Sequence, residues 1–225
     1  MEIMLDTANL QSIRMAIEIF PISGVTTNPS IISREKNIDF YDQLRKIRSL
    51  IGCDRSLHVQ VLGSDCQTIV NEAESLTNIV DKQIYIKVPV NSEGLKAIRI
   101  LKSKGFNVTA TCIFTKMQAI LAILSGADYI APYINRMANL DIEPYETLSF
   151  IQDYIVNHKS NTKIVAASFK NISQLTSSIN CGIAAMTVEP TLLYEIFNYP
   201  AISNAIGKFR EDFVSVYGTK TLDQL

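Results

Sequence analysis

Short β-branched runs alternate regularly along this chain with longer segments of helical apolar spacing, and this alternation limits the folds open to it. The eight runs are EIMLD, GVTTN, SLHVQVL, IYIKVPV, NVTATCIF, DYIAPYI, KIVAAS and AAMTV. Helical segments such as EGLKAIRILKSKG lie between them, and a helical tail over residues 200–225 follows the last unit. The alternation predicts an α/β fold: a single-domain (β/α)8 TIM barrel over residues 1–225, with an additional C-terminal helix.

A doubly wound open sheet is the competing architecture, because it also alternates strands with helices. No G-x-G-x-x-G motif follows the first run, which argues against the dinucleotide-binding version of that fold. With 47% hydrophobic residues, the chain can fill the core of one barrel domain. The barrel is therefore the preferred prediction.

The charge composition argues against several classes of partner. The 21 basic and 22 acidic residues nearly cancel and form no long like-charge run. We therefore expect no binding to nucleic acid or to an anionic membrane. The N-terminus, MEIMLDTANL, lacks the pattern of a signal peptide, and no apolar run reaches the roughly 18 residues of a membrane-spanning helix. We expect a soluble, cytoplasmic protein.

The distribution of cysteine and histidine argues against metal chemistry. The four cysteines are widely spread without a C-x-x-C pair, and the two histidines, His58 and His158, are far apart. We expect reduced thiols, no metal site and no cofactor. His158 is expected in a solvated loop, whereas His58 can belong either to the core or to a site.

Polar residues interrupt or end seven of the eight runs. In a barrel, the carboxyl ends of all strands meet at one mouth, where the chemistry takes place. The residues are Asp6 in the first run, Thr26, Thr27 and Asn28 in the second, Gln60 in the third, Lys87 in the fourth, Thr111 in the fifth, Tyr133, Asn135 and Arg136 at the end of the sixth, and Ser168 and Lys170 at the end of the seventh. Barrel geometry predicts that they point at one mouth.

Lys87 is the most informative of these residues. It stands between Ile86 and Val88 in an apolar run, and a lysine is almost never fully buried without a partner or a use. Burial disfavours the charged ammonium, and a neutral amine can form a Schiff base with a carbonyl. The alternatives are an ion pair with Asp6 or a head group that reaches solvent. The spacing alone leaves these readings open.

Arg136, together with Ser168 and Lys170, suggests an anion site. A guanidinium suits phosphate well, and a hydroxyl adds a hydrogen-bond donor. The alternative is a set of surface charges, which is the simpler reading for Lys170 taken alone.

The stretches GVTTNPSII, IYIKVPV, IAPYINR and ASFK resemble the transaldolase family and, more narrowly, its small fructose-6-phosphate aldolase branch. The resemblance runs over essentially the whole chain. It implies a class I aldol mechanism with Lys87 as the Schiff-base lysine and no metal. It also implies that Asp6 and Asn28 position the lysine and a substrate hydroxyl, with Thr26 beside them in substrate binding. Thr111 matches the threonine that holds the catalytic water.

Two positions distinguish the branches of this family. The chain has Gln60 where true transaldolases resemble one another in having glutamate, and Tyr133 where they have phenylalanine. Both look like the aldolase branch. An aldolase must protonate the enamine that remains on Lys87 after cleavage, and a phenol supplies a proton route that phenylalanine cannot. The resemblance therefore implies that Tyr133 is the general acid/base, acting through water held by Gln60 and Thr111.

Some segments depart from the aldolase pattern. Arg136 and Ser168 match the phosphate contacts of the family, with Lys170 beside them. After Arg136, however, the chain reads MANLDIEP, which matches neither the Gly-rich aldolase segment nor the transaldolase Arg-x-Asp-Asp pattern. The strand TATCIFT looks closer to the transaldolase one.

These features predict reversible cleavage of fructose 6-phosphate into dihydroxyacetone and glyceraldehyde 3-phosphate. The first alternative is a transaldolase of the pentose phosphate pathway, which passes the dihydroxyacetone unit to an aldose phosphate. The second is a non-catalytic barrel that binds sugar phosphates and keeps Lys87 as a structural ion pair. The expected partners are sugar phosphates, dihydroxyacetone and further copies of the chain. For the copies, the resemblance suggests stacked pentameric rings, so a pentamer or decamer.

Overall fold

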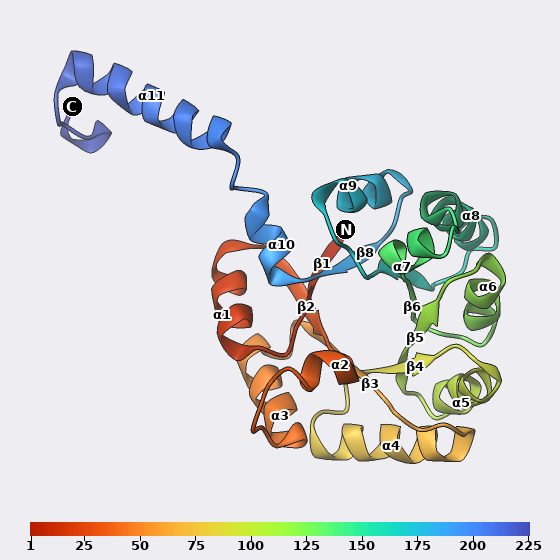
Figure 1. Ribbon diagram of the computed structural model, residues 1–225. Coiled ribbons are helices and arrows are strands. Elements are labelled where there is room, and N and C mark those ends of the chain that lie inside the picture. The colour runs from red at the N-terminus through yellow and green to blue at the C-terminus, as the bar shows by residue number, and fades with distance from the viewer. The chain divides into compact units, whose positions relative to one another are not determined.

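Eight parallel strands close into a barrel and follow one another around it in chain order, as the computed structural model of residues 1–225 shows (Figure 1). The strands are β1 (Glu2–Asp6), β2 (Ile22–Thr26), β3 (Ser56–Gln60), β4 (Tyr85–Pro89), β5 (Asn107–Ile113), β6 (Tyr129–Pro132), β7 (Lys163–Ala166) and β8 (Ala185–Val188). Strand β1 pairs with both β2 and β8, which closes the barrel. The predicted barrel is therefore confirmed, and the open sheet is not formed.

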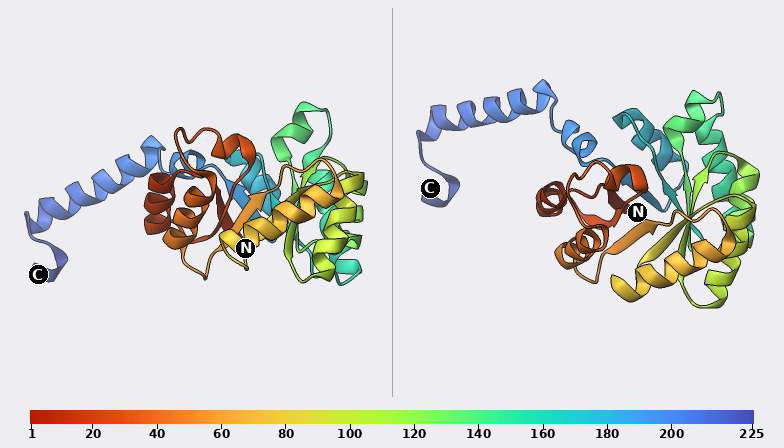
Figure 2. Two further views of the ribbon diagram at one scale, coloured as in Figure 1. Left: turned by 90° about the horizontal axis from the view of Figure 1, so that it is seen from below. Right: turned by 60° about the horizontal axis from the view of Figure 1, so that its bottom comes forward.

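Helices α1, α3, α4, α5, α6, α8 and α9 surround the strands of the barrel (Figures 1 and 2). The helices of the chain are, in order, α1 (Leu10–Ile19), α2 (Pro29–Ile32), α3 (Phe40–Ile51), α4 (Cys66–Ile79), α5 (Ser92–Ser103), α6 (Lys116–Leu124), α7 (Ile134–Asn139), α8 (Pro144–Asn157), α9 (Ile172–Asn180), α10 (Pro190–Glu195) and α11 (Pro200–Tyr217), followed by the 3₁₀ turn η1 (Leu222–Gln224). The short helices α2 and α7 were not predicted from the sequence. Each lies in the loop between a strand and the longer helix that follows it.

The chain divides into two compact units, Met1–Pro190 and Thr191–Leu225. The first contains the barrel. The second contains α11, which confirms the predicted C-terminal helix. None of the helices is long and apolar enough to cross a bilayer.

Side chains that cap helix N-termini fix where several loops end. Asp65 caps α4, and Glu93 lies in the first turn of α5. Asn28 caps α2 by accepting a hydrogen bond from the Ile31 amide at 3.0 Å. This cap turns the chain sharply at the end of β2, so the residues on either side of it lie at the barrel mouth.

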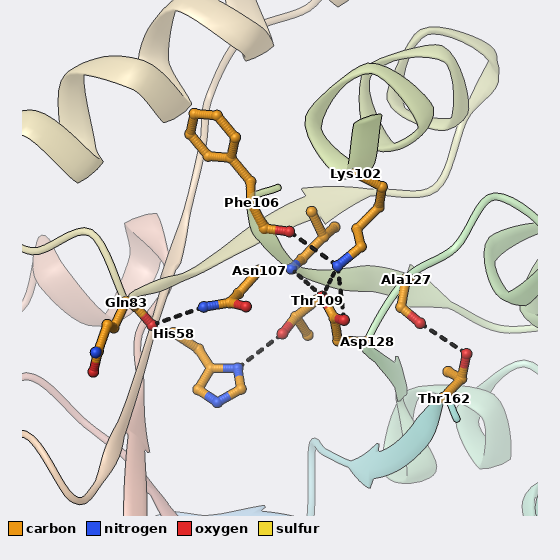
Figure 3. Close-up of polar contacts among 10 residues, drawn as sticks. His58, Gln83, Lys102, Phe106, Asn107, Thr109, Ala127, Asp128 and Thr162 are labelled. Atoms are coloured by element: carbon orange, nitrogen blue, oxygen red, sulfur yellow. Dashed lines mark hydrogen bonds and ion pairs between the residues drawn. The ribbon is translucent and has the colours of Figure 1, made fainter. Parts of the chain in front are cut away.

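An aromatic cluster fills the amino-terminal half of the barrel interior. His58 is fully buried, stacks on Tyr85 at 4.5 Å and meets the edge of Tyr129 at 5.3 Å. Its Nδ1 lies 2.8 Å from the hydroxyl of Thr109 (Figure 3). Burial lowers the pKa of His58 well below its ordinary 6.5, so the ring is neutral at pH 7. His58 is therefore a core residue, and the cluster forms a floor beneath the mouth.

The end of β4 is packed tightly against the start of α5. A Cβ added to Gly94 in α5 would lie 1.9 Å from the carbonyl oxygen of Pro89. No side chain fits at that distance, so the glycine permits this close approach of helix and strand. The contact supports the strand that carries Lys87.

We expect Gly94→Ala to lower the free energy of unfolding by about 1–3 kcal/mol, because backbone atoms must move apart to admit the methyl group. Urea unfolding followed by circular dichroism measures the change. Arg99→Ala, at an exposed position of the same helix, is the control and should stay within about 0.5 kcal/mol of wild type. Equal effects of the two substitutions would contradict the packing argument.

Candidate active site

A cavity of about 320 Å³ opens at the carboxyl ends of the strands. Its walls include most of the residues predicted from the sequence: Asp6, Asn28, Lys87, Tyr133, Asn135, Arg136, Ser168 and Lys170. They come from the ends of β1 and β2, from the interior of β4, and from the loops after β6 and β7. The predicted meeting of these side chains at one mouth is therefore observed.

Lys87 lies at the base of this cavity. Its side chain is almost wholly buried, with 5% of the residue exposed, and Nζ donates a hydrogen bond of 2.8 Å to the carbonyl oxygen of Thr27. Burial lowers the pKa of the Lys87 amine below its ordinary value, although the nearby Asp6 acts in the opposite direction. The head group therefore does not reach bulk solvent, and a larger share of it is neutral than for an exposed lysine.

Asp6 is held by a separate hydrogen-bond partner. The hydroxyl of Thr26 donates to Asp6 Oδ1 at 2.7 Å, and the same hydroxyl lies 2.7 Å from that of Thr187. Burial raises the pKa of Asp6, while Lys87 and the hydrogen bond from Thr26 oppose the rise. The lysine is thus hydrogen-bonded to a carbonyl and the carboxylate to a hydroxyl, rather than to one another.

Tyr133 is buried beside the end of β6. Its hydroxyl lies 2.9 Å from the hydroxyl of Thr111, and the guanidinium of Arg136 lies 4.8 Å from the centre of its ring. Burial is the main cause that raises the pKa of Tyr133 to about 12. At pH 7 the group is a protonated phenol that can donate a proton.

The cationic end of the cavity lies in the loops after β6 and β7. The backbone N–H of Asn135 donates a hydrogen bond of 2.9 Å to the backbone carbonyl of Ser168, which connects the two loops. Ser168 has a φ of 64°, in the left-handed region that is uncommon for residues other than glycine. Arg136 and Lys170 both line this end of the cavity, so their side chains can meet one anion.

The sequence placed some of these residues incorrectly along the chain. Asn135 and Arg136 were predicted at the end of the sixth strand, but β6 ends at Pro132 and both residues belong to α7. The helix starts here because the Met137 amide bonds to the carbonyl of Tyr133 at 2.9 Å. Ser168 and Lys170 lie in the loop beyond β7, which ends at Ala166.

Gln60 is near the site without forming part of the cavity wall. It is the last residue of β3 and the register partner of Lys87 on β4. Register partners on neighbouring strands point to the same face of a sheet. The side chains of Gln60 and Lys87 therefore both point into the barrel interior. Thr26 and Thr111 do not line the cavity either, but each is hydrogen-bonded to a residue that does, Thr26 to Asp6 and Thr111 to Tyr133.

Three features of the mouth were missed in the sequence. Arg34 and Glu189 both line the cavity and form an ion pair of 3.2 Å across the rim. Glu189 directly follows β8, so its place after the eighth run was a usable signal, whereas Arg34 comes after the unpredicted helix α2. Cys112 lies with its sulfur 3.7 Å from the Tyr133 hydroxyl. All four cysteines are free, and no three His, Cys, Asp or Glu side chains gather as metal ligands would.

This combination defines a (β/α)8 barrel with a buried, amine-bearing pocket at the carboxyl ends of its strands. Residues 3–221 match the family described as "Transaldolase/Fructose-6-phosphate aldolase". A curated protein of Streptococcus pneumoniae (strain ATCC 700669 / Spain 23F-1), named "Probable fructose-6-phosphate aldolase", is 40% identical over 222 residues, which are 99% of this chain and 100% of that protein. The chain belongs to the transaldolase/fructose-6-phosphate aldolase family.

Solved structures of low sequence identity share the fold. The "Native KDPGal structure" has a TM-score of 0.59 at 13% identity, covering 83% of this chain and 81% of that one. A mandelate racemase/muconate lactonizing protein from Paracoccus denitrificans PD1222, complexed with magnesium, has a TM-score of 0.57 at 13% identity, covering 85% and 54%. At this identity they support the barrel fold alone.

The lowered pKa of Lys87 predicts how the free energy of unfolding changes with pH. Below the ordinary lysine value of 10.5, the unfolded chain binds this proton more readily than the folded chain does, so stability is lost as the pH falls from 10.5 toward the folded pKa. Lys87→Met lacks this contribution. We expect its free energy of unfolding to rise less steeply than that of wild type between pH 7 and pH 10.5, as measured by urea unfolding.

The control is Lys96→Met, because Lys96 is exposed on α5. The folded state raises the pKa of Lys96 through its hydrogen bond to Glu93, so this control should not flatten the curve. If wild type and Lys87→Met show parallel pH dependence, the amine of Lys87 is not destabilised as a cation.

Proposed function

We propose that this chain is a class I aldolase that reversibly cleaves fructose 6-phosphate into dihydroxyacetone and glyceraldehyde 3-phosphate, without metal or cofactor. The observation that carries the proposal is the buried amine of Lys87 at the base of the cavity. A binding protein has no need of such a group, whereas Schiff-base chemistry requires a neutral amine. Family membership and the name of the Streptococcus pneumoniae relative support the same reaction.

In this mechanism Lys87 attacks the ketone carbon of the open-chain sugar, and loss of water gives a protonated Schiff base. Removal of the proton from the C4 hydroxyl breaks the C3–C4 bond and releases glyceraldehyde 3-phosphate. The bonding electrons move into the Schiff base and leave an enamine on the lysine. Protonation at C3, followed by addition of water, releases dihydroxyacetone and restores the amine.

Tyr133 is the general acid/base of the enamine step, in which it gives a proton to C3 through water. Its phenol is protonated at pH 7 and lies on the same cavity as Lys87. The Thr111 hydroxyl, 2.9 Å from the phenol oxygen, fixes the phenol by a hydrogen bond. In the proposed mechanism Thr111 also holds a bridging water, which Gln60 orients. A positioned acid/base group such as Tyr133 contributes about 100- to 10,000-fold in rate. Asp6, together with Thr26, orients the lysine and a substrate hydroxyl.

The phosphate of the sugar lies at the cationic end of the cavity. Arg136 offers a planar set of donors, Lys170 adds a second positive charge, and Ser168 adds a hydroxyl. Asn28 binds a hydroxyl at the other end, next to Asp6. The substrate therefore spans the cavity with its phosphate toward α7 and its ketone toward β4.

A transaldolase, which transfers the dihydroxyacetone unit to an aldose phosphate in the pentose phosphate pathway, uses the same Schiff base. The two reactions differ in the fate of the enamine. The aldolase proposal places the protein among cytoplasmic enzymes of carbohydrate metabolism and assigns the release of dihydroxyacetone to the Tyr133 phenol.

The deciding assay follows glyceraldehyde 3-phosphate with a coupled reductase, with and without erythrose 4-phosphate. We expect steady product from fructose 6-phosphate without the acceptor. Tyr133→Phe should lower dihydroxyacetone release by about 100- to 10,000-fold, while borohydride trapping on Lys87, read as a mass increase by peptide mass spectrometry, stays near wild type.

Tyr129→Phe is the matched control, since it removes a hydroxyl from the aromatic cluster away from the mouth, and it should leave both readouts unchanged. Steady product only with erythrose 4-phosphate identifies a transaldolase. Absence of any trapped mass on Lys87 would identify a non-catalytic barrel. Equal losses of release and trapping in Tyr133→Phe would remove the role assigned to this phenol.

The second unit supports a further proposal, that the chain forms a homo-oligomer such as a pentamer or decamer. No residue of α11 is buried, yet one side of this helix carries an apolar stripe with exposed fractions of 40% at Ile202, 63% at Ile206, 72% at Phe209 and 71% at Val216. A lone helix with such a stripe gains its stability from packing on a partner. A second copy of this chain is the occupant.

Deletion of residues 199–225 should convert the oligomer to smaller species in multi-angle light scattering. Phe209→Glu should act in the same direction, because it places a charge in the stripe. Lys208→Glu, beside the stripe, is the control and should leave the mass unchanged. A full-length chain that is already monomeric at micromolar concentration would contradict the proposal.

A further inference from the structure

The feature that carries a further inference is an extra residue in β5. Between the pairs Ala110↔Ile130 and Ile113↔Pro132, the register advances three residues on β5 and two on β6. Cys112, inside this step, has a φ of 59°, in the left-handed region that a branched or bulky residue rarely enters. The arrangement is a β-bulge, which re-aims side chains and is common beside active sites.

The bulge changes what Cys112 can touch. Consecutive side chains of a regular strand point to opposite faces, so Thr111 and Cys112 would be separated by the sheet. Here both reach the same atom: the Tyr133 hydroxyl lies 2.9 Å from the Thr111 oxygen and 3.7 Å from the Cys112 sulfur. The second distance is within the range of a hydrogen bond to sulfur.

Two partners determine the direction of the phenol O–H. A thiol is a weak donor and a weak acceptor, and a threonine hydroxyl is both donor and acceptor. When Tyr133 gives its proton to the enamine through water, negative charge develops on its oxygen. The hydrogen bond from the Thr111 hydroxyl stabilises that charge and lowers the pKa of Tyr133, whereas the Cys112 sulfur raises the pKa and favours the phenol that still carries its proton.

We propose that Cys112 is a positioning residue, delivered by the β5 bulge, that orients the Tyr133 hydroxyl for proton transfer to the enamine. The inference rests on the proposed function, since it assigns a group to one step of that reaction. The plain alternative is that Cys112 fills space beside Tyr133. The ring is already packed by Phe114, 5.5 Å away edge to face, and by the Arg136 guanidinium, so the ring position does not depend on the thiol.

The test separates cleavage from enamine release in Cys112→Ala and Cys112→Ser. Rapid quench in a single turnover of fructose 6-phosphate measures glyceraldehyde 3-phosphate formation, and dihydroxyacetone release is followed over the same time course. For Cys112→Ala we expect release to slow by about three- to tenfold, the usual weight of one hydrogen bond. Cleavage and borohydride trapping should stay within about twofold of wild type.

Cys112→Ser should restore most of the release rate, because its hydroxyl can take the place of the thiol. Cys181→Ala is the matched control: its partly buried thiol bonds to the Ser177 carbonyl at 3.4 Å, away from the mouth. A normal release rate in Cys112→Ala, an equal loss in both steps, or a serine variant as slow as the alanine variant would overturn the inference. Wild-type protein that releases no dihydroxyacetone without an acceptor would instead refute the aldolase proposal itself, and the inference with it.

Discussion

The hydrogen bond from the buried amine of Lys87 to the Thr27 carbonyl is the interaction on which the rest of the site depends. It places a titratable group deep between strands, where water cannot stabilise its charge. The surroundings hold it there. The aromatic cluster around His58 closes the barrel beneath Lys87. The close approach of Gly94 to Pro89 packs β4, the strand that carries Lys87, against α5. The amine is thus presented upward into a cavity that is closed below.

One physical cause explains the electrostatics of the whole mouth. Burial lowers the pKa of Lys87 and raises the pKa values of Asp6 and Tyr133, so each group is shifted toward its neutral form. The neutral form of the amine is a nucleophile, and the neutral form of the phenol is an acid. The same desolvation therefore prepares two opposite roles in one cavity. The charged residues Arg136 and Lys170 lie at the solvent-exposed end, where their charges cost less.

Regular structure positions most of the site, and irregular structure completes it. Strand interiors carry Lys87 and Thr111, whose side chains follow the normal alternation. The contacts outside that alternation come from a bulge at Cys112, a helix at Arg136 and a left-handed residue at Ser168. At each of these three places the backbone leaves regular strand geometry, and a side chain there meets a partner from a neighbouring strand or loop.

The barrel could be predicted from the sequence, because strand and helix periods alternate eight times. The sequence also placed Lys87 in an apolar strand, but its burial is a finding of the structure, since the spacing left open whether the head group reaches solvent. The sequence further identified the polar residues that gather at the mouth, since all carboxyl ends of parallel strands meet there. Four features of the site became visible in the folded chain alone: Gln60 lies off the cavity wall, Arg136 belongs to a helix, Arg34 reaches Glu189, and Cys112 touches Tyr133. The reason is that periodicity reports which face of an element is buried. Loop helices, ion pairs between distant segments and a bulge at a cysteine depend on contacts between strands, and these leave no period in the sequence.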